Sequence, residues 1–421
     1  CCGGGRRNGP VVVTGDGGAG TFNFVRALED DGISPDRSAE DIGRAWLNYL
    51  VKERSILWWG GNGNSTEHTA WLNLKRGIPA PQSGSIETNG KTIAEQIGAQ
   101  IFIDWCALVA PCQPELAAKL AEQAGKVSHD GESVYASMLW AAMEAEAFRT
   151  RDIDTVLDVG LSVIPANCLI AKVIADVRAW SKKHPDWQVT RQLIEDKYGY
   201  DKYPGNCHII PNHAIMIMSI LYAPDDYQKS QMIINTSGWD TDCNAGNVGC
   251  LIAIKEGLSC FDKGPDFRGP LADRMLISSS DGGNSINDAV RVAYYLTNLG
   301  RQLARQPALE QPKSGAQFHF SLQGSLQGFL PLAGKNACPG HSVANISGAL
   351  ALHFSALGPR QEACATTPVF TPPEVRNMRT YDLMASPLLY PGQTLKAKIA
   401  APVGNIGQVK AYLRLRVYDS N

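Results

Sequence analysis

Two acidic side chains stand one residue apart in the segment GWDTDCNAGNVG, residues 238–249. Asp240 and Asp242 precede a run of small and aliphatic residues that predicts a buried helix. Helix positions two apart point to different sides, so both carboxylates can reach one ion only from the turn and the first helical turn. Carboxylate oxygens are the ligands that Mg²⁺ prefers. We therefore expect Asp240 and Asp242 to bind a divalent metal ion.

The simpler interpretation of this segment is an ordinary helix N-cap, in which Asp240 or Thr241 accepts hydrogen bonds from backbone N–H groups. A cap needs one acid, whereas D-T-D in an apolar context offers two, so we favour the metal site. Cys243 is interpreted as a packing residue, because a thiol is a poor ligand for Mg²⁺. The neighbouring Trp239 is expected to contact the substrate.

This motif resembles the C-terminal metal motif of the ADP-ribosylglycohydrolase family. Other segments are similar to that family in order and spacing, over roughly residues 12–305. They are AEDIGRAWLNYL (39–50), IGAQIFID (97–104), PELAAKLAEQA (114–124), VSHDG (127–131) and AAMEAEAF (141–148). The resemblance implies an all-α enzyme that uses a pair of Mg²⁺ ions to cleave N- or O-glycosidic bonds to ribose, with Mn²⁺ and Ca²⁺ as alternative ions.

In the resembled family a second acidic cluster, T-D-D-T, lies near the N-terminus and completes the metal site. Counting back from FVRALED places this cluster on residues 15–18, where only Asp16 carries a carboxylate. Asp16 is therefore an expected metal ligand and catalytic residue. The three glycines at 15, 17 and 18 indicate either a weakened enzyme or placeholders for the natural residues.

Cleavage of a ribosidic bond passes through an oxocarbenium-like transition state, helped by an activated water and an acid at the leaving group. Asp242 is the residue that we expect to orient this water. Residues 58–68, WWGGNGNSTEH, predict a sugar-facing loop, because Trp stacks on sugars and Asn hydrogen-bonds to them. Its expected substrate contacts are Trp58, Trp59, Asn62 and Asn64. Glu67 is either a catalytic acid/base or an acid that stabilises the N-terminus of the next helix.

Further polar residues match the substrate cleft of the family or lie where they could reach it. His129 and Asp130 occupy the V-S-H-D-G turn, where a purely structural role is the alternative. Asp104 also matches a family acid, and burying its carboxylate without a partner would be costly. Three more residues are expected near the same cleft: His208, Asn212 and Asp281.

The chain of 421 residues has a formal net charge of −2 and only 19% charged residues, with 41 Gly and 24 Pro. This charge offers no basic face for nucleic acid and no polybasic patch for a membrane. No apolar run approaches the ~20 residues of a spanning helix. The composition favours a secreted over a cytoplasmic protein by a small margin, although no signal peptide is recognised. We expect a monomer that acts on a small molecule or glycan.

The chain contains 11 cysteines, so at least one has no partner within the chain. Cys338 and Cys364 are predicted to form a disulfide if the protein is exported. No C-x-x-C zinc pattern is present. Sequons at Asn64, Asn235 and Asn345 are about as many as chance predicts, so they do not decide the compartment.

The pattern from Ser38 to Ala304 predicts a helical bundle without strands, which we assign to a catalytic domain over residues 1–305. Ser38 and Asp41 form the signature of a capping box for a helix through AWLNYL. Further predicted helices cover 92–110, 115–124, 133–148, 166–183, 211–222, 242–257 and 285–303. Pro165 is expected to start the helix at 166.

The pattern changes after Arg305. A Pro-rich linker, QPALEQPKSG, is followed by AQFHFSL, ALALHFSAL, TLKAKIAA and VKAYLRLRVY, in which apolar and polar residues alternate. This predicts a smaller all-β sandwich over residues 306–421. It resembles jelly-roll carbohydrate-binding modules by pattern alone, and we expect it to be incomplete because the chain ends directly after a predicted strand.

Three functions compete. The first is a metal-dependent hydrolase of a glycosidic bond to ADP-ribose or a related furanose. The attached sandwich favours a secreted glycan-degrading glycoside hydrolase instead. The third is a sugar-binding relative without activity, because the resembled family includes lens crystallins that kept only the fold. The glycines at 15–18 favour the third function, and the intact D-T-D-C-N motif opposes it.

Overall fold

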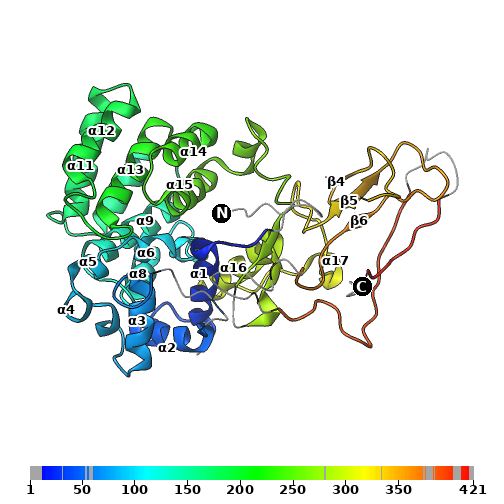
Figure 1. Cartoon of the computed structure of the whole chain (residues 1–421), viewed down its shortest axis with the longest axis horizontal. Coiled ribbons are helices and arrows are strands. Elements are labelled where there is room, and N and C mark those ends of the chain that lie inside the picture. Colours follow the sequence, from blue (N-terminus) through cyan, green and yellow to red (C-terminus); the bar gives the residue numbers. More distant parts are fainter. Residues whose placement is uncertain are drawn as a thin grey trace.

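A helical body carries the chain from its N-terminal part to about residue 303, and an extended C-terminal part projects from it (Figure 1). The computed structural model describes residues 12–30, 32–52, 55, 60–278, 281–332, 334–372, 375, 383, 385–401 and 409–416. In that part of the chain no helix combines the length and apolar character needed to cross a membrane.

The helical body contains sixteen α-helices in the described residues. They are α1 (Asp16–Phe24), α2 (Ala39–Tyr49), α3 (Thr66–Lys75), α4 (Ile86–Asn89), α5 (Lys91–Ala94), α6 (Gly98–Ile101), α7 (Asp104–Val109), α8 (Pro114–Gly125), α9 (Glu132–Ala147), α10 (Ile153–Ser162), α11 (Leu169–Lys183), α12 (Trp187–Tyr198), α13 (Ile209–Tyr222), α14 (Tyr227–Thr236), α15 (Thr241–Glu256) and α16 (Ala289–Leu303). The helical fold predicted from the sequence is therefore confirmed.

Helices α9 and α13 form the centre of this body. Every residue of α13 from Ile209 to Ile220 is buried, and a helix that is apolar on all sides must be surrounded by other elements. Helix α13 packs against α9, α11, α12, α14 and α15. The helix that follows the D-T-D motif, α15, is thus held on a rigid core.

Several helix boundaries follow from caps that the sequence shows. The capping box of Ser38 and Asp41 is present at the start of α2. The start expected at Pro165 is wrong, because α11 begins at Leu169 and the Cys168 thiol accepts a hydrogen bond from the backbone N–H of Ala171. Helices α10, α12 and α14 were not predicted, although each begins after an Asp that caps it.

The single helix predicted over residues 92–110 is wrong, because three short helices, α5, α6 and α7, replace it. Between the first two, the backbone pairs with the segment that leads into α13. The Ile97 N–H donates to the Cys207 carbonyl at 2.8 Å, and the Ile209 N–H donates to the Glu95 carbonyl at 3.0 Å. This long-range pairing takes the backbone groups that a continuous helix would use.

The expectation of no strand before residue 305 is also wrong. Strand β1 (Arg274–Leu276) pairs antiparallel with β2 (Ile286–Asp288), so the predicted helix from 285 begins only at Ala289 as α16. Val13 forms a parallel bridge to Leu276, and the Thr14 N–H donates to the Leu276 carbonyl at 2.9 Å. This pairing fixes the segment that leads into α1.

The described C-terminal residues form two short ribbons and the short helix α17 (Pro312–Gly315). Strand β3 (Leu330–Pro331) pairs with β6 (Ala365–Thr366), and β4 (Ser342–Ile346) pairs with β5 (Ala349–His353). The predicted jelly-roll sandwich is not shown. The segments TLKAKIAA and VKAYLRLRVY contain no strand in their described residues, and Ile399 and Tyr412 are 62% and 76% exposed. Alternation defines an apolar face, but a strand also needs a paired neighbour.

The expected disulfide between Cys338 and Cys364 is absent, because both cysteines are free. The Cys338 thiol instead donates to the Ala356 carbonyl at 2.8 Å. At the Asn345 sequon, the side-chain amide donates to the carbonyls of Phe320 and Ser325, both at 2.8 Å. The Asn345 amide therefore links the β4 strand to the segment of residues 320–325.

Candidate active site

The turn before α15 holds Asp240 in a defined orientation. Gly238 and Trp239 both have positive φ, at 82° and 62°, a conformation that is costly for a residue with a side chain. The Asp240 carboxylate accepts no capping hydrogen bond from α15. The interpretation of this acid as an ordinary N-cap is therefore wrong.

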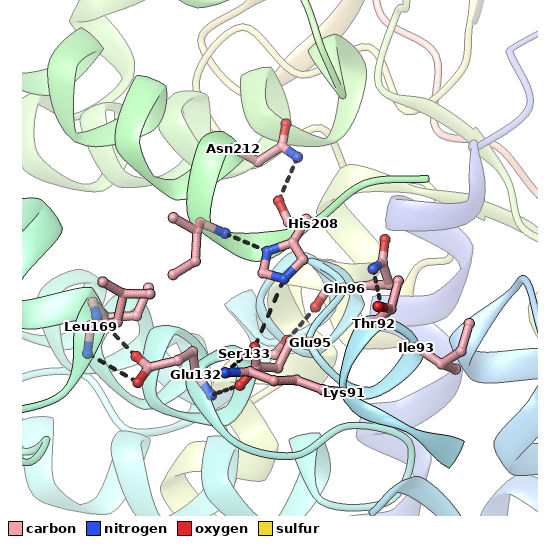
Figure 2. A network of polar contacts seen from close by, with 12 residues as sticks. Lys91, Thr92, Ile93, Glu95, Gln96, Glu132, Ser133, Leu169, His208 and Asn212 are labelled. Atoms are coloured by element: carbon pink, nitrogen blue, oxygen red, sulfur yellow. Dashed lines mark hydrogen bonds and ion pairs between the residues drawn. The ribbon is translucent and has the colours of Figure 1, made fainter. Parts of the chain in front are cut away.

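One buried amide organises this turn. The Asn212 Oδ1 atom accepts from the Asp240 backbone N–H at 3.1 Å and from the Asn244 side chain at 2.9 Å. The Asn212 Nδ2 atom donates to the Tyr200 hydroxyl and to the His208 carbonyl, both at 2.8 Å; Figure 2 shows the contact with His208. Asn212 therefore positions the acidic motif from the helical core.

The residues of the motif fit a hard divalent cation. Asp240, Asp242 and Cys243 each offer a ligand atom, and these atoms lie within 4.8 Å of one another. Asp242 is exposed and Asp240 is half-buried, so water can complete an octahedral shell of the kind that Mg²⁺ retains. The Cys243 thiol adds nothing for Mg²⁺ and would matter only for a softer ion.

Residues far apart in the sequence line the same opening as this motif, a space of about 5120 Å³ that extends to Arg416 in the C-terminal part. The wall of this opening brings together Gly15 before α1, Asn64 to Glu67 at the start of α3, Gly98 at the start of α6, and Asp240 with Asp242. The cavity continues over the C-terminal part of the chain. The N-terminal segment, the start of α3 and the D-T-D motif therefore face a common space.

Glu67 occupies a narrow slot in this wall. It lies in the first turn of α3, after the Ser65 cap, and only 7% of it is exposed. The Ser65 hydroxyl donates to Glu67 Oε2 at 3.4 Å, and His129 Nε2 lies 3.7 Å from Glu67 Oε1. A Cβ on Gly98 would overlap the carboxylate. Glu67 is thus a confined acid, in addition to lying at a helix N-terminus.

His129 faces Glu67 as a neutral ring. Burial lowers the pKa of His129 to about 3, because the charged imidazolium is poorly solvated there. Its Nδ1 atom lies 2.7 Å from the Ser128 hydroxyl, and within the described part of the chain its Nε2 atom has no hydrogen-bond partner. The contact with Glu67 is therefore a polar contact and not an ion pair at neutral pH.

Four other expected site residues do not line the cavity wall. Asp130 accepts from the backbone of Ile86 at 3.0 Å, and Asp281 accepts from Arg26 at 2.9 Å. His208 caps α13 through Nδ1, and its Nε2 atom faces Glu95 Oε2 at 3.8 Å (Figure 2). The fourth residue is Asp104, which accepts from Asn247 at 2.7 Å. All four make contacts that position backbone or neighbouring side chains.

Only some of the residues expected to face the sugar lie at the cavity. Asn64 lines the cavity and Asn62 is exposed beside it. The Trp239 ring lies under the Arg191 guanidinium at 3.9 Å and beside the Tyr200 ring at 5.5 Å, so it anchors the turn. The remaining expected residues, Trp58, Trp59 and the side chain of Asp16, lie outside the described residues.

The predicted sugar-facing loop, which contains the candidate acid Glu67, also carries an acid-and-hydroxyl segment, although the T-D-D-T match was expected at residues 15–18. Residues 66–69 read T-E-H-T, which keeps the hydroxyl-acid-x-hydroxyl order of T-D-D-T. Thr66 and Glu67 line the cavity. Thr66 and Thr69 donate to the carbonyls of Ile93 and Ser65, at 2.6 and 2.7 Å, which anchors the segment.

The structure thus shows an all-helical body with acidic side chains at the opening between α3, α6 and α15. The family model described as ADP-ribosylglycohydrolase matches residues 15–299, which is more than half of the chain. The chain therefore belongs to the ADP-ribosylglycohydrolase family, whose description is of hydrolases of ADP-ribose glycosidic bonds. A comparison with curated proteins finds no match.

Proposed function

We propose that this protein is a Mg²⁺-dependent hydrolase that cleaves an N- or O-glycosidic bond to ADP-ribose or a related furanose. One observation carries the proposal: Asp240 and Asp242 from the start of α15 and Glu67 from the start of α3 line the same cavity. Glycoside hydrolysis commonly requires acidic groups on both sides of the scissile bond. The family supplies the substrate class.

Asp240 and Asp242 would hold the ion, with Asn212 fixing the turn that presents them. In such sites a divalent ion stabilises developing negative charge and favours deprotonation of water. Asp242 is exposed to the cavity and would orient the attacking water. Glu67 would act as the acid/base or hold a sugar hydroxyl, because its slot excludes most solvent.

We also propose that Glu67 supplies the second acidic half of the site, with Asp16 as a further ligand. The T-E-H-T segment carries an acid between two hydroxyls, whereas residues 15–18 carry one acid among glycines. This assignment removes the reason to regard the enzyme as crippled. The glycan-degrading alternative is weaker, because it depended on a sandwich that the described residues do not form.

The test compares the parent chain with Asp242→Asn on an ADP-ribosylated peptide and on an aryl furanoside. Release of the sugar should require Mg²⁺ and stop after chelation with EDTA. Asp242→Asn should lower kcat by about 10²-fold or more while KM changes little, because orientation of water matters chiefly in the transition state. The matched control is Asp262→Asn, an exposed acid outside the cavity, which should leave both constants unchanged.

The opposite result is equally specific. A parent chain that binds Mg²⁺ and ADP-ribose but hydrolyses neither substrate would replace the hydrolase with a sugar-binding protein of the same fold. Isothermal titration of ADP-ribose, with and without Mg²⁺, separates loss of binding from loss of turnover.

A further inference from the structure

A second cluster of ligand-type side chains lies inside the helical body, outside the cavity wall. Asp104 at the start of α7, Glu144 on α9 and Cys250 on α15 each offer one ligand atom. These atoms lie within 4.8 Å of one another. Three helices therefore bring two carboxyl groups and a thiol to one point.

Glu144 is fully buried, and only half of its carboxylate is satisfied. Its Oε1 atom accepts from the Trp140 indole at 3.2 Å, while within the described residues Oε2 has no hydrogen-bond partner. A buried carboxylate oxygen without a donor is costly. A proton shared with Asp104, the Cys250 thiol or a bound cation could each satisfy this oxygen.

No ion pair among the described residues balances the charge of the cluster. In the part of the chain that the structure describes, no Lys, Arg or His forms an ion pair with Asp104 or Glu144. The Lys255 ammonium on α15 binds Asp225 at 2.6 Å and also Glu256. Burial raises the pKa of both carboxyl groups above their ordinary range. Without a cation, the two acids must therefore retain a proton.

We propose that Asp104, Glu144 and Cys250 bind one divalent transition-metal ion of the zinc type. Carboxylate and thiolate together suit Zn²⁺ and its neighbours, whereas Mg²⁺ and Ca²⁺ take oxygen ligands alone. This site is independent of the Mg²⁺ site and of the hydrolase activity. It goes beyond them, since it assigns a structural ion to the interior of the helical body.

The surroundings of the cluster support the assignment. The Asn247 amide donates to Asp104 Oδ1 at 2.7 Å and fixes the orientation of that carboxylate. Gln100 in turn lies 3.4 Å from Asn247 Oδ1, and its own Oε1 lies 2.7 Å from His213 Nδ1. Outer hydrogen bonds of this kind orient the ligands of protein metal sites.

Binding of the ion balances the protons of the cluster. Burial beside the two acids raises the pKa of the Cys250 thiol, so the ligand-free cluster holds a neutral thiol. The ion displaces the thiol proton and the proton held by the carboxyl pair, and both are released to solvent.

The test uses the full-length chain, stripped with a chelator and titrated with Co²⁺ as a spectroscopic substitute for Zn²⁺. We expect one equivalent to bind with a near-ultraviolet thiolate-to-cobalt charge-transfer band. The band should disappear in Cys250→Ser and persist in Cys243→Ser, which removes the thiol beside Asp240 and Asp242. Loss of the band in Cys243→Ser alone would overturn the proposal and place the ion at the D-T-D motif.

Two further measurements keep the test independent of folding defects in the cysteine variant. Metal analysis of the parent chain should find one zinc that dialysis against Mg²⁺ does not remove. Asn247→Ala keeps all three ligands and should lower the Co²⁺ affinity by about 10- to 100-fold. A parent chain with neither zinc nor a cobalt band would show that the cluster holds a proton instead, and would overturn the proposal whatever the hydrolase assay finds.

Discussion

Gly98 at the start of α6 leaves the space that the Glu67 carboxylate fills. A Cβ on residue 98 would overlap Glu67 Oε1 and lie 2.7 Å from Cε1 of His129. The backbone just before it is fixed, because the Ile97 N–H donates to the Cys207 carbonyl at 2.8 Å. A side chain at residue 98 must therefore move Glu67 rather than its own backbone.

We predict that Gly98→Ala lowers kcat/KM by about 10²-fold, the effect expected when a catalytic group is displaced by about 1 Å. Overpacking should also lower the free energy of unfolding by about 1–3 kcal/mol. Steady-state kinetics and urea unfolding measure the two effects. Full activity in this variant would show that the position of Glu67 does not matter for turnover.

The matched control is Gly246→Ala on α15. A Cβ there meets no atom within 4 Å, and Ala is favoured over Gly in a helix by about 1 kcal/mol. Gly246→Ala should therefore leave the kinetics unchanged and raise the free energy of unfolding slightly. A loss of activity equal to that of Gly98→Ala would mean that any added methyl group near the site is harmful.

A second prediction concerns Asn212, which accepts from both Asp240 and Asn244. Asn212→Ala leaves these buried donors without an acceptor, at a cost of about 1–3 kcal/mol of stability. It should also reduce the rise in Tm that Mg²⁺ produces, because the turn that presents Asp240 loosens. Asn235→Ala removes an exposed amide bonded within its own helix and is the control. If Mg²⁺ raises the Tm of Asn212→Ala as much as that of the parent, the Asn212 amide does not support the metal site.

The helical class could be predicted because it depends on local signals. Apolar periodicity marked α8, α9 and α13, and the Ser38–Asp41 box marked the start of α2. The break of the predicted helix over 92–110 could not be predicted, since it depends on pairing between Glu95–Ile97 and residues more than 100 positions away. A short stretch of sequence contains no signal for contacts between residues so far apart.

The candidate site likewise has features that could be predicted from the sequence and features that could not. The closeness of the two acids of the motif could be predicted from their spacing, and their binding of a metal stays a prediction. The contact between Gly98 and Glu67 could not be predicted, because Glu67 lies on another helix. His129 and Asp130 are neighbours in sequence, yet one faces Glu67 and the other accepts from the Ile86 backbone. Side-chain direction in a turn is decided by packing and not by residue type.

A third prediction concerns pH. Burial lowers the pKa of His208 from 6.5 to about 4, and those of His129 and His213 to about 3. Each ring is neutral in the folded protein but takes up a proton in the unfolded chain once the pH falls below 6.5. Stability is therefore fully present above pH 6.5. It should fall by up to about 1.4 kcal/mol per pH unit for each histidine as the pH decreases towards 4.

His208→Asn tests this sign at one position. Asn keeps an acceptor for the Ile210 N–H, which His208 caps at 3.2 Å, and removes the titrating ring (Figure 2). Urea unfolding between pH 7 and pH 5 should show a slope reduced by about one proton. Glu95 opposes the trend in both proteins, because burial raises its pKa. An unchanged slope would show that His208 is protonated in the folded state as well.

The last prediction concerns the boundary between the helical body and the C-terminal part. Residues 306–311 are exposed and form no regular element, and the exposed Arg305 precedes them. Trypsin should therefore cut after Arg305, as well as at exposed lysines such as Lys396 and Lys398. The two fragments should nevertheless elute together, because the Leu326 and Gln327 N–H groups donate to Asp273 Oδ2 at 2.6 and 3.1 Å across the cut. Asp273→Ala should weaken this association more than Asp262→Asn does, while the backbone bonds from Gly328 to Ala272 and from Ser386 to Gly282 remain. Separation of the parent fragments without any mutation would mean that the C-terminal part is an independent domain on a flexible linker.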